Sequence, residues 1–201
     1  MIHPGTAISS YYGMKNKYVV HSPGGWVELR GGPRGIAGVK LLQHAPAAPQ
    51  AKAQALRPFA ELLARYFEGT PINRRAVMAT SSAASDGPGL EAKAGRIFSQ
   101  IFEVLESSNC TAFHLDVYRR LASVPFGSVI SYGELARRAG RPGAGRAVGG
   151  AMGANDFPLF IPCHRVVRAD GRPGGFAAGR QWKVFLLRNE GHRMEGGRLK
   201  S

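Results

Sequence analysis

The stretch SYGELARRAGRPGAGRAVGGAMGAN, residues 131–155, contains two helical patterns separated by a short turn. Ser131 and Glu134 have the spacing of a capping box, which predicts the start of the first helix. That pattern ends at Gly140, and the second, residues 144–152, repeats apolar residues at i, i+3, i+4, i+7 and i+8. Two helices joined by the four residues 140–143 predict a helix-turn-helix motif, although two helices that only pack together have the same spacing.

The second helical pattern has an unusual opposite face, formed by Arg146, Gly149, Gly150 and Gly153. Each glycine inside a helix costs about 1 kcal/mol relative to alanine, so three on one face indicate that something approaches the backbone closely. Arg146 falls in the first turn, where the helix dipole disfavours a cation. The pattern favours a surface pressed against a partner; the alternative is a second helix packed on the glycines, with Arg146 in solvent.

Downstream, the apolar run 157–162 ends at Cys163, followed by His164 and Arg165. The run predicts a buried extended segment. A lone cysteine is commonly an inert core residue, but an adjacent imidazole and guanidinium favour the reactive thiolate. Neighbouring strand residues point to opposite faces, so contact between Cys163 and His164 would need a turn or a bridging water.

The rest of the chain predicts two lobes. Residues 18–20, 26–29 and 36–42 are β-prone and separated by turn signals, which indicates an antiparallel meander. Helical spacing predicts helices over 58–67, 97–105 and 115–122. The predicted divisions are an N-terminal lobe at 1–70, a linker with an extra helix at 71–110, a C-terminal domain at 111–192 and a basic tail at 193–201.

Charge and composition narrow the function. The 201 residues carry a net charge of +14, and residues 111–201 hold +9 of it, so we expect a polyanion such as nucleic acid to bind the C-terminal half; basic residues that only aid solubility are the alternative. No apolar run reaches the roughly 18 residues of a membrane span, and no secretory signal is predicted. Two cysteines exclude a disulfide framework and a cysteine-only zinc site, which indicates a reducing, intracellular compartment.

Four ordered blocks resemble the 6-O-alkylguanine-DNA alkyltransferases, also called methylated-DNA–protein-cysteine methyltransferases. The blocks are Pro162-Cys163-His164-Arg165-Val166, Ser131 to Ala136, Arg146 to Met152 with Asn155, and Gly174 to Gly191. The resemblance is dense over 111–192 and weaker over 1–70, where chiefly Tyr66-Phe67-Glu68-Gly69 is similar. It implies an α/β (α+β) fold class: an N-terminal ribonuclease-H-like lobe with a small antiparallel sheet, and a mainly helical C-terminal lobe with a winged-helix-like helix-turn-helix.

The resemblance also implies a reaction, in which a 6-O-alkylguanine is flipped out of duplex DNA and its alkyl group moves irreversibly to Cys163. Glu190, His164 and a water would activate the thiol, and Tyr132 would rotate the nucleotide and donate a proton to the departing guanine. Arg146 would fill the space left in the base stack, and Asn155 would be a hinge. The implied DNA-binding residues are Arg146, Ala147, Gly149, Gly150, Tyr132 and Arg165; the implied substrate-binding residues are Tyr132, Cys163, Val166, Phe176 and Ala177.

Several positions depart from the family pattern. Asp156 replaces a frequent proline, and we expect its carboxylate to weaken DNA binding slightly; Phe176, Ala177 and Tyr118 replace Tyr, Ser and Trp. Some members hold zinc in the N-terminal lobe, but His3, His21 and His44 are its only ligand candidates here, so we expect no metal and no cofactor. The resemblance implies a monomer that binds double-stranded DNA and does not bind a membrane. It implies a location in the cytoplasm if the source is a prokaryote, or in the nucleus if the source is a eukaryote.

Three other functions fit parts of the pattern. The first is a relative that binds damaged DNA without efficient alkyl transfer, although Cys163 is present. The second is a Cys–His hydrolase or transferase for a small molecule, with incidental basic charge. The third is a helix-turn-helix regulator, although no further DNA-binding segment or sensor module is evident.

Overall fold

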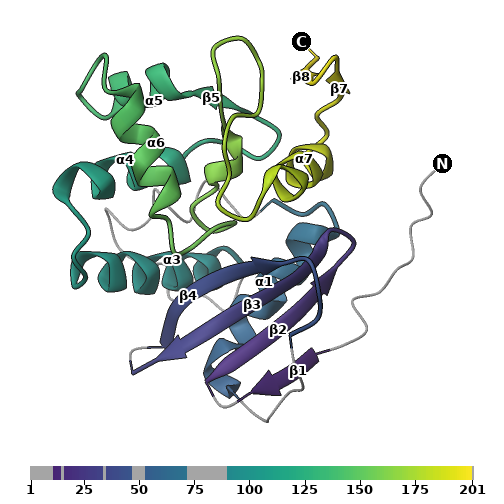
Figure 1. Ribbon diagram of the computed structural model, residues 1–201. Helices are drawn as coiled ribbons and strands as arrows, with labels where there is room; N and C mark the ends of the chain where they lie inside the picture. The colour runs from purple at the N-terminus through teal and green to yellow at the C-terminus, as the bar shows by residue number, and fades with distance from the viewer. Residues whose placement is uncertain (1–10, 15, 34, 47–52, 72–89, 201) are drawn as a thin grey trace.

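The computed structural model describes residues 11–14, 16–33, 35–46, 53–71 and 90–200. A four-stranded antiparallel meander forms the N-terminal lobe, with strands β1 (Tyr11–Met14), β2 (Lys17–Ser22), β3 (Gly25–Gly32) and β4 (Gly35–Leu42) in that order (Figure 1). Three of these were predicted, and the structure lengthens each of them. β1 was missed, and it extends the sheet by pairing with β2.

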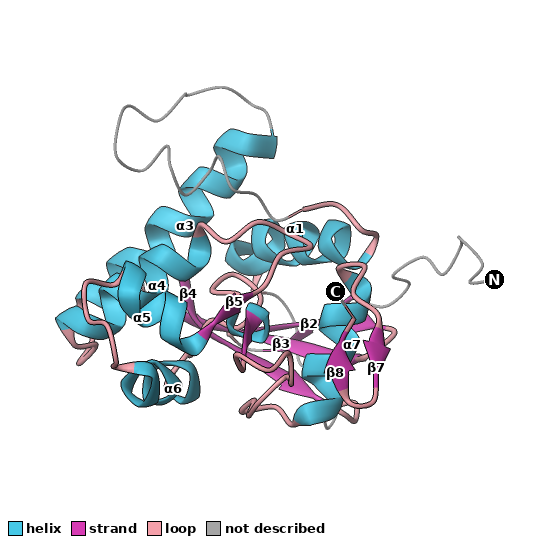
Figure 2. Ribbon diagram, turned by 90° about the horizontal axis from the view of Figure 1, so that it is seen from above, coloured by secondary structure: helices cyan, strands magenta, loops and turns pink. Residues whose placement is uncertain are grey.

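Two helices pack against this sheet. The 3₁₀ turn η1 (Gln54–Leu56) leads into α1 (Arg57–Phe67), which buries the predicted apolar face on the sheet. The extra helix of the linker is α3 (Leu90–Glu106), longer than the predicted 97–105. Seen from above, α1 lies on the side of the molecule opposite the helix-turn-helix (Figure 2). Residues 72–89 of the predicted linker and the candidate ligand His3 lie outside the described residues.

The C-terminal half is mainly helical. Its first helix, α4 (Ala112–Ala122), is capped by Thr111, whose hydroxyl accepts a hydrogen bond from the backbone N–H of His114. The predicted helix-turn-helix is α5 (Tyr132–Arg138) and α6 (Gly145–Gly153). The remaining elements are β5 (Ile130–Ser131), η3 (Cys163–Arg165), β6 (Val166–Val167), α7 (Arg180–Asn189), β7 (Met194–Glu195) and β8 (Arg198–Leu199).

The predicted capping box of α5 is only half formed. Ser131 Oγ accepts from the backbone N–H of Glu134 at 3.1 Å. The Glu134 carboxylate, however, pairs with Arg137 and Arg138 further along the helix instead of reaching back to the cap. The hydroxyl therefore fixes the start of α5, and with it the position of Tyr132.

A shared core joins the two halves. Phe160 of the C-terminal half packs edge-on against Phe59 of α1 and Phe98 of α3. The backbone N–H of Val39 in β4 donates to the carbonyl of Asp156, just after α6, at 2.7 Å. The segment between α6 and Cys163 is thus held directly against the N-terminal lobe. Among the described residues, no helix combines the length and apolar character needed to cross a membrane.

Two predictions of local structure were wrong. Cys163 does not end an extended strand: residues 163–165 form the 3₁₀ turn η3, because the chain bends after Pro162. The predicted basic tail at 193–201 contains the hairpin of β7 and β8, which pair antiparallel with Met194 opposite Leu199.

Candidate active site and DNA-binding surface

The turn η3 places the thiol of Cys163 beside the end of α6. Asn155 lies two residues past that helix, and its amide Nδ2 is 3.1 Å from Cys163 Sγ and 2.9 Å from the carbonyl of Ile161. Its side-chain oxygen accepts from the backbone N–H of Phe157. Asn155 thereby ties the end of α6 to the segment that carries the cysteine.

Behind the thiol lies a buried carboxylate. Glu190 follows α7, and its side chain has no exposed surface. Its Oε1 is 2.7 Å from Nε2 of His164 and accepts from the hydroxyl of Tyr66 at 2.8 Å. Its Oε2 accepts from the backbone N–H of Gly127 at 3.1 Å. One carboxylate therefore joins α1 and the loop before β5 to the turn that holds the cysteine.

Arg165 completes this buried network and is not placed to bind DNA. Its side chain is 3% exposed, and its guanidinium donates to both oxygens of Glu190, at 2.9 Å each, and to the carbonyl of Val124 at 2.6 Å. The DNA-binding role predicted for Arg165 is contradicted, because a guanidinium bound on both edges inside the protein cannot reach a phosphate. Its structural role is to neutralise Glu190.

The network sets the protonation of its members. Burial alone would raise the pKa of Glu190, but the hydrogen bonds from His164 and Arg165, together with the charge of Arg165, hold that pKa well below its ordinary value. Burial lowers the pKa of His164, although the carboxylate opposes this shift. Burial raises the pKa of Cys163 against the effects of Asn155 and Lys183. At neutral pH the site thus holds an ionised glutamate, a neutral imidazole and a protonated thiol.

The DNA-facing side predicted for α6 is open. Arg146, Ala147 and Gly150 are exposed, and a methyl group added at Gly149, Gly150 or Gly153 would meet no atom within 4 Å. The alternative in which another helix packs on these glycines is therefore wrong. Ala147, first counted on the apolar face, points outward, and the buried face consists of Val148, Ala151 and Met152.

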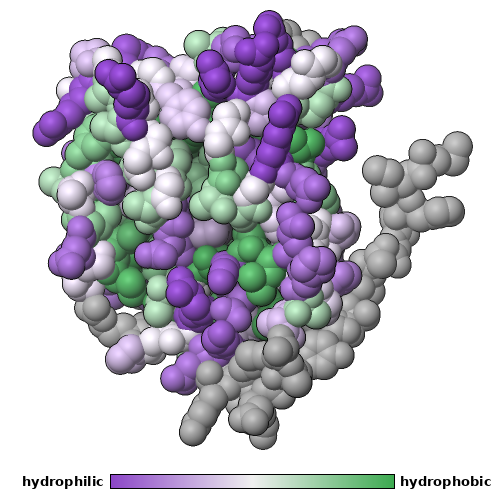
Figure 3. Space-filling model, in the orientation of Figure 1, coloured by the Kyte–Doolittle hydropathy of each residue, from purple (hydrophilic) through white to green (hydrophobic). Residues whose placement is uncertain are grey.

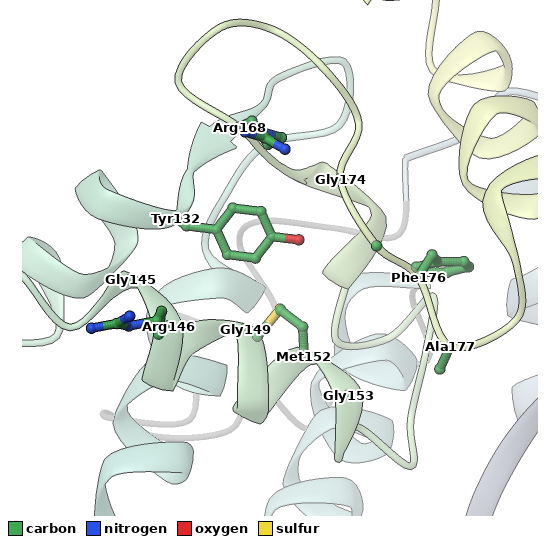
Figure 4. Close-up of a pocket in the computed structure, with 11 residues that line it drawn as sticks. Tyr132, Gly145, Arg146, Gly149, Met152, Gly153, Arg168, Gly174, Phe176 and Ala177 are labelled. Atoms are coloured by element: carbon green, nitrogen blue, oxygen red, sulfur yellow. The ribbon is translucent and has the colours of Figure 1, made fainter.

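A cavity of about 500 Å³ opens beside this face (Figure 4). Figure 4 shows Tyr132 crossing its middle, α6 on one side and Arg168 with Gly174 on the other. Gly174 has a φ of 74°, and a Cβ there would lie 3.1 Å from the Tyr132 hydroxyl, so glycine is needed for both reasons. Burial and the nearby Cys163 raise the pKa of Tyr132, which keeps its proton available for donation.

A second cavity, of about 200 Å³, lies deeper and contains Cys163. Met152, Phe176 and Ala177 border both cavities, so the two cavities adjoin each other. Val166 lines neither cavity: it is fully buried, and its carbonyl accepts from Lys183 at 2.6 Å. The predicted backbone contact from Val166 to a base therefore has no support in this structure.

Two departures from the family pattern have clear structural roles. Asp156 faces the N-terminal lobe, where its carboxylate is 3.6 Å from Arg30, so the expected repulsion of DNA has no support. Tyr118 is buried and donates its hydroxyl hydrogen to the carbonyl of Ala151 at 2.7 Å, which fastens α4 to α6.

Sequence reasoning missed two residues of the site. Tyr66 was assigned to the apolar face of its helix, yet its hydroxyl contacts both Glu190 and His164. The only sign of this role in the sequence was that Tyr66 belongs to a block that resembles the family. Lys183 is fully buried, bridges the carbonyls of Val166 and Gly175, and has a pKa lowered to about 8 by burial. A lysine among the apolar residues of α7 was the signal for it.

Comparisons with known proteins agree with this geometry. Residues 112–192 match the family described as 6-O-methylguanine DNA methyltransferase, DNA binding domain. The methylated-DNA–protein-cysteine methyltransferase of Rattus norvegicus is 35% identical over 195 residues, which cover 88% of this chain and 83% of that protein. The enzyme of the same name from Salmonella typhimurium is 41% identical over 114 residues, covering 55% of this chain and 67% of that protein.

The fold is shared as well. Mycobacterium tuberculosis OGT in complex with DNA superposes with a TM-score of 0.56 at 27% identity, over 86% of this chain and 90% of that chain. The likeness to the rat protein includes the N-terminal lobe that supplies Tyr66, and the family match includes the turn of Cys163 and His164. Sequence, fold and buried cysteine site together place this chain in the methylated-DNA–protein-cysteine methyltransferase family of DNA repair enzymes.

Proposed function

We propose that this protein flips a 6-O-alkylguanine out of duplex DNA and transfers the alkyl group irreversibly to Sγ of Cys163. The observation that carries the proposal is the orientation of His164. Its Nε2 is 2.7 Å from the ionised Glu190, whereas its Nδ1 is buried and has no hydrogen-bond partner among the described residues. With the proton on Nε2, the Nδ1 lone pair is free to accept the thiol proton, through a water where the direct path is too long.

The chemistry balances with these groups. The thiol proton passes to His164, a bond forms between Sγ and the alkyl carbon, and the bond from that carbon to oxygen 6 breaks. The departing guanine takes a proton from the Tyr132 hydroxyl, which regains one from solvent as His164 gives its own up. The thioether is stable, and the site contains no second thiol to remove the alkyl group, since Cys110 is the only other cysteine and lies on the connection before α4. Each protein, acting as a monomer, therefore reacts once.

Base flipping follows from the depth of the thiol. Cys163 is 5% exposed and lies in the inner cavity, so a guanine stacked in a duplex cannot reach it. The open glycine face of α6 permits close approach to a minor groove, and Arg146 projects from the first turn of α6 at the edge of the outer cavity. This position supports the proposal that Arg146 occupies the space that the flipped base leaves.

The test is intact-protein mass spectrometry after incubation with a duplex that contains one 6-O-methylguanine. We expect the mass to rise by one methyl group in place of one hydrogen, with the modification mapped to Cys163. The matched control is Cys163→Ser, which should bind the duplex and gain nothing. Binding without a mass change in the unmodified protein would support the damage-binding alternative; a methyl group mapped to Cys110 would contradict the proposed site.

A further inference from the structure

The β7–β8 hairpin is built onto a loop at the rim of the outer cavity. Gly196 and Gly197 have φ values of 54° and 78°, the two positive angles of a type I′ turn, so the hairpin is tightly closed. The backbone N–H of Leu199 in β8 donates to the carbonyl of Gly171 at 2.9 Å. Within the loop, the N–H of Arg168 donates to the carbonyl of Arg172, also at 2.9 Å. Hairpin and loop therefore form one hydrogen-bonded unit.

This unit gathers four arginines, Arg168, Arg172, Arg180 and Arg198, called here the arginine cluster. Arg168 and Arg172 lie 3.8 Å and 3.4 Å from the carboxylate of Asp170. Arg198 is near enough for its charge to act on the same carboxylate. The guanidinium of Arg180 lies against the hairpin turn, with Nη2 3.3 Å from the point where a Cβ on Gly197 would be.

The arginine cluster is not neutralised. A hydrogen bond from the backbone N–H of Arg172, and then the charges of the neighbouring arginines, lower the pKa of Asp170 and keep it ionised. In the described ranges, Asp170 is the only carboxylate that pairs with any of the four guanidinium groups. The side chains of Arg168 and Arg172 are 61% and 53% exposed. Positive charge is thus concentrated on an exposed and well-supported surface that the proposed alkyl transfer does not use.

The position of the arginine cluster indicates its ligand. Arg168 lines the outer cavity, and Figure 4 shows it across Tyr132 from α6. On the face of the molecule seen in Figure 3, hydrophilic side chains gather along the upper edge, where Figure 1 shows the loop and the hairpin. A nucleotide that enters the cavity from a duplex on α6 leaves the sugar-phosphate backbone of its own strand at this rim.

We propose that the arginine cluster binds backbone phosphates of the DNA strand that carries the alkylated guanine, a proposal that rests on the function proposed above. Guanidinium groups bind phosphate oxygens through charge-assisted, bidentate hydrogen bonds. The hairpin holds the cluster in place before DNA arrives, which reduces the ordering cost of binding. The DNA-binding surface then has two parts, α6 in the groove and the arginine cluster on the backbone beside the cavity.

The first test measures duplex affinity at several salt concentrations for wild type and for Arg172→Gln/Arg198→Gln. For each phosphate that the variant no longer neutralises, the slope of log K against log salt should fall in magnitude by about 0.9. Between 50 and 200 mM salt, the drop in affinity should therefore shrink about 3-fold per phosphate. Arg65→Gln on α1 is the control for charge alone: it removes one charge from an exposed site on the N-terminal lobe, and its effect on the slope is compared per charge removed. Reaction with free 6-O-benzylguanine shows whether the cysteine site is folded.

The second test uses a change of the opposite sign. Asp170→Asn keeps an oxygen for the N–H of Arg172 but removes the negative charge, so duplex affinity should rise. Uncharged methylphosphonates next to the damaged base, in the strand that carries this base, should weaken binding by the wild-type protein. The same substitutions should hardly affect binding by the double variant. Equal salt slopes in wild type and the double variant, or a methylphosphonate effect confined to the complementary strand, would overturn the proposal. Failure of wild type to bind DNA or take up the alkyl group would instead reject the proposed function.

Discussion

Replacing Glu190 by glutamine should destabilise the fold and stop alkyl transfer, and the two effects can be separated. The carboxylate accepts hydrogen bonds from Tyr66, Gly127 and Arg165 and lies 2.7 Å from His164, with no exposed side-chain surface. Glutamine turns an NH₂ group toward one set of these donors and leaves Arg165 buried without a counter-charge. Breaking a buried pair in this way costs about 3–5 kcal/mol.

That cost is a large part of a typical unfolding free energy of about 5–15 kcal/mol. For a chain of this size, Tm falls by about 2–4 °C per kcal/mol, so Glu190→Gln should melt about 6–20 °C below wild type. The assay is thermal unfolding, paired with the rate of reaction with free 6-O-benzylguanine at a temperature where the variant is folded.

The variant Arg165→Met/Glu190→Gln separates stability from chemistry. Methionine removes the orphaned charge at similar volume, so no buried guanidinium is left without a counter-charge beside Gln at 190. We expect the double variant to regain most of the lost Tm but not the reaction rate, since His164 still lacks its carboxylate. A destabilisation below about 1 kcal/mol in Glu190→Gln, or transfer restored by the double change, would refute the assignment of Glu190 to both roles.

Three further predictions concern the same site. Arg146→Ala should slow repair of duplex DNA far more than reaction with free 6-O-benzylguanine, because only the duplex requires a base to be unstacked. Unstacking costs a few kcal/mol, and each 1.36 kcal/mol added to the activation free energy slows a reaction about tenfold. Equal slowing of both reactions would make Arg146 structural. Tyr66→Phe should lower the unfolding free energy by about 1.5–3 kcal/mol, measured in urea, because it deletes a buried hydrogen bond to a charged acceptor. The free energy of unfolding should fall as the pH drops below about 6.5, because His164 is protonated in the unfolded chain but resists protonation in the fold. It should fall again below about 4.3, where protonation of Glu190 begins to favour the unfolded chain. Tm measured against pH in wild type and in His164→Gln isolates the step from His164, and identical profiles of the two proteins would contradict that step.

Local pattern was enough to predict α6 and its open face. The spacing of apolar residues in 144–152 indicated α6, and Arg146 and the glycines were placed on its outer face because helical periodicity is a property of neighbouring residues. The same reasoning misplaced Ala147, since small apolar residues occur on both faces of a helix. The start of α5 was predicted for a similar reason: Ser131 caps it through a bond three residues away.

The buried network could not be predicted in this way. Tyr66 and Glu190 are 124 residues apart, and no local spacing indicates that their side chains meet. Arg165 was predicted to bind DNA only from its place in the family motif, and only the tertiary fold shows that it points inward to Glu190. The turn at Cys163 was only one of two possibilities from the sequence, the other being a bridging water, because an apolar run that ends at Pro162 has the composition of a strand.

The most direct test of single, irreversible transfer is a titration with excess damaged DNA. The protein is mixed with increasing amounts of a duplex that carries 6-O-methylguanine, and both repaired guanine and methylated protein are counted at completion. The account predicts that both plateau at one per protein molecule, with every methyl group on Cys163. Continued repair beyond one equivalent, or repaired guanine without methylated Cys163, would contradict it.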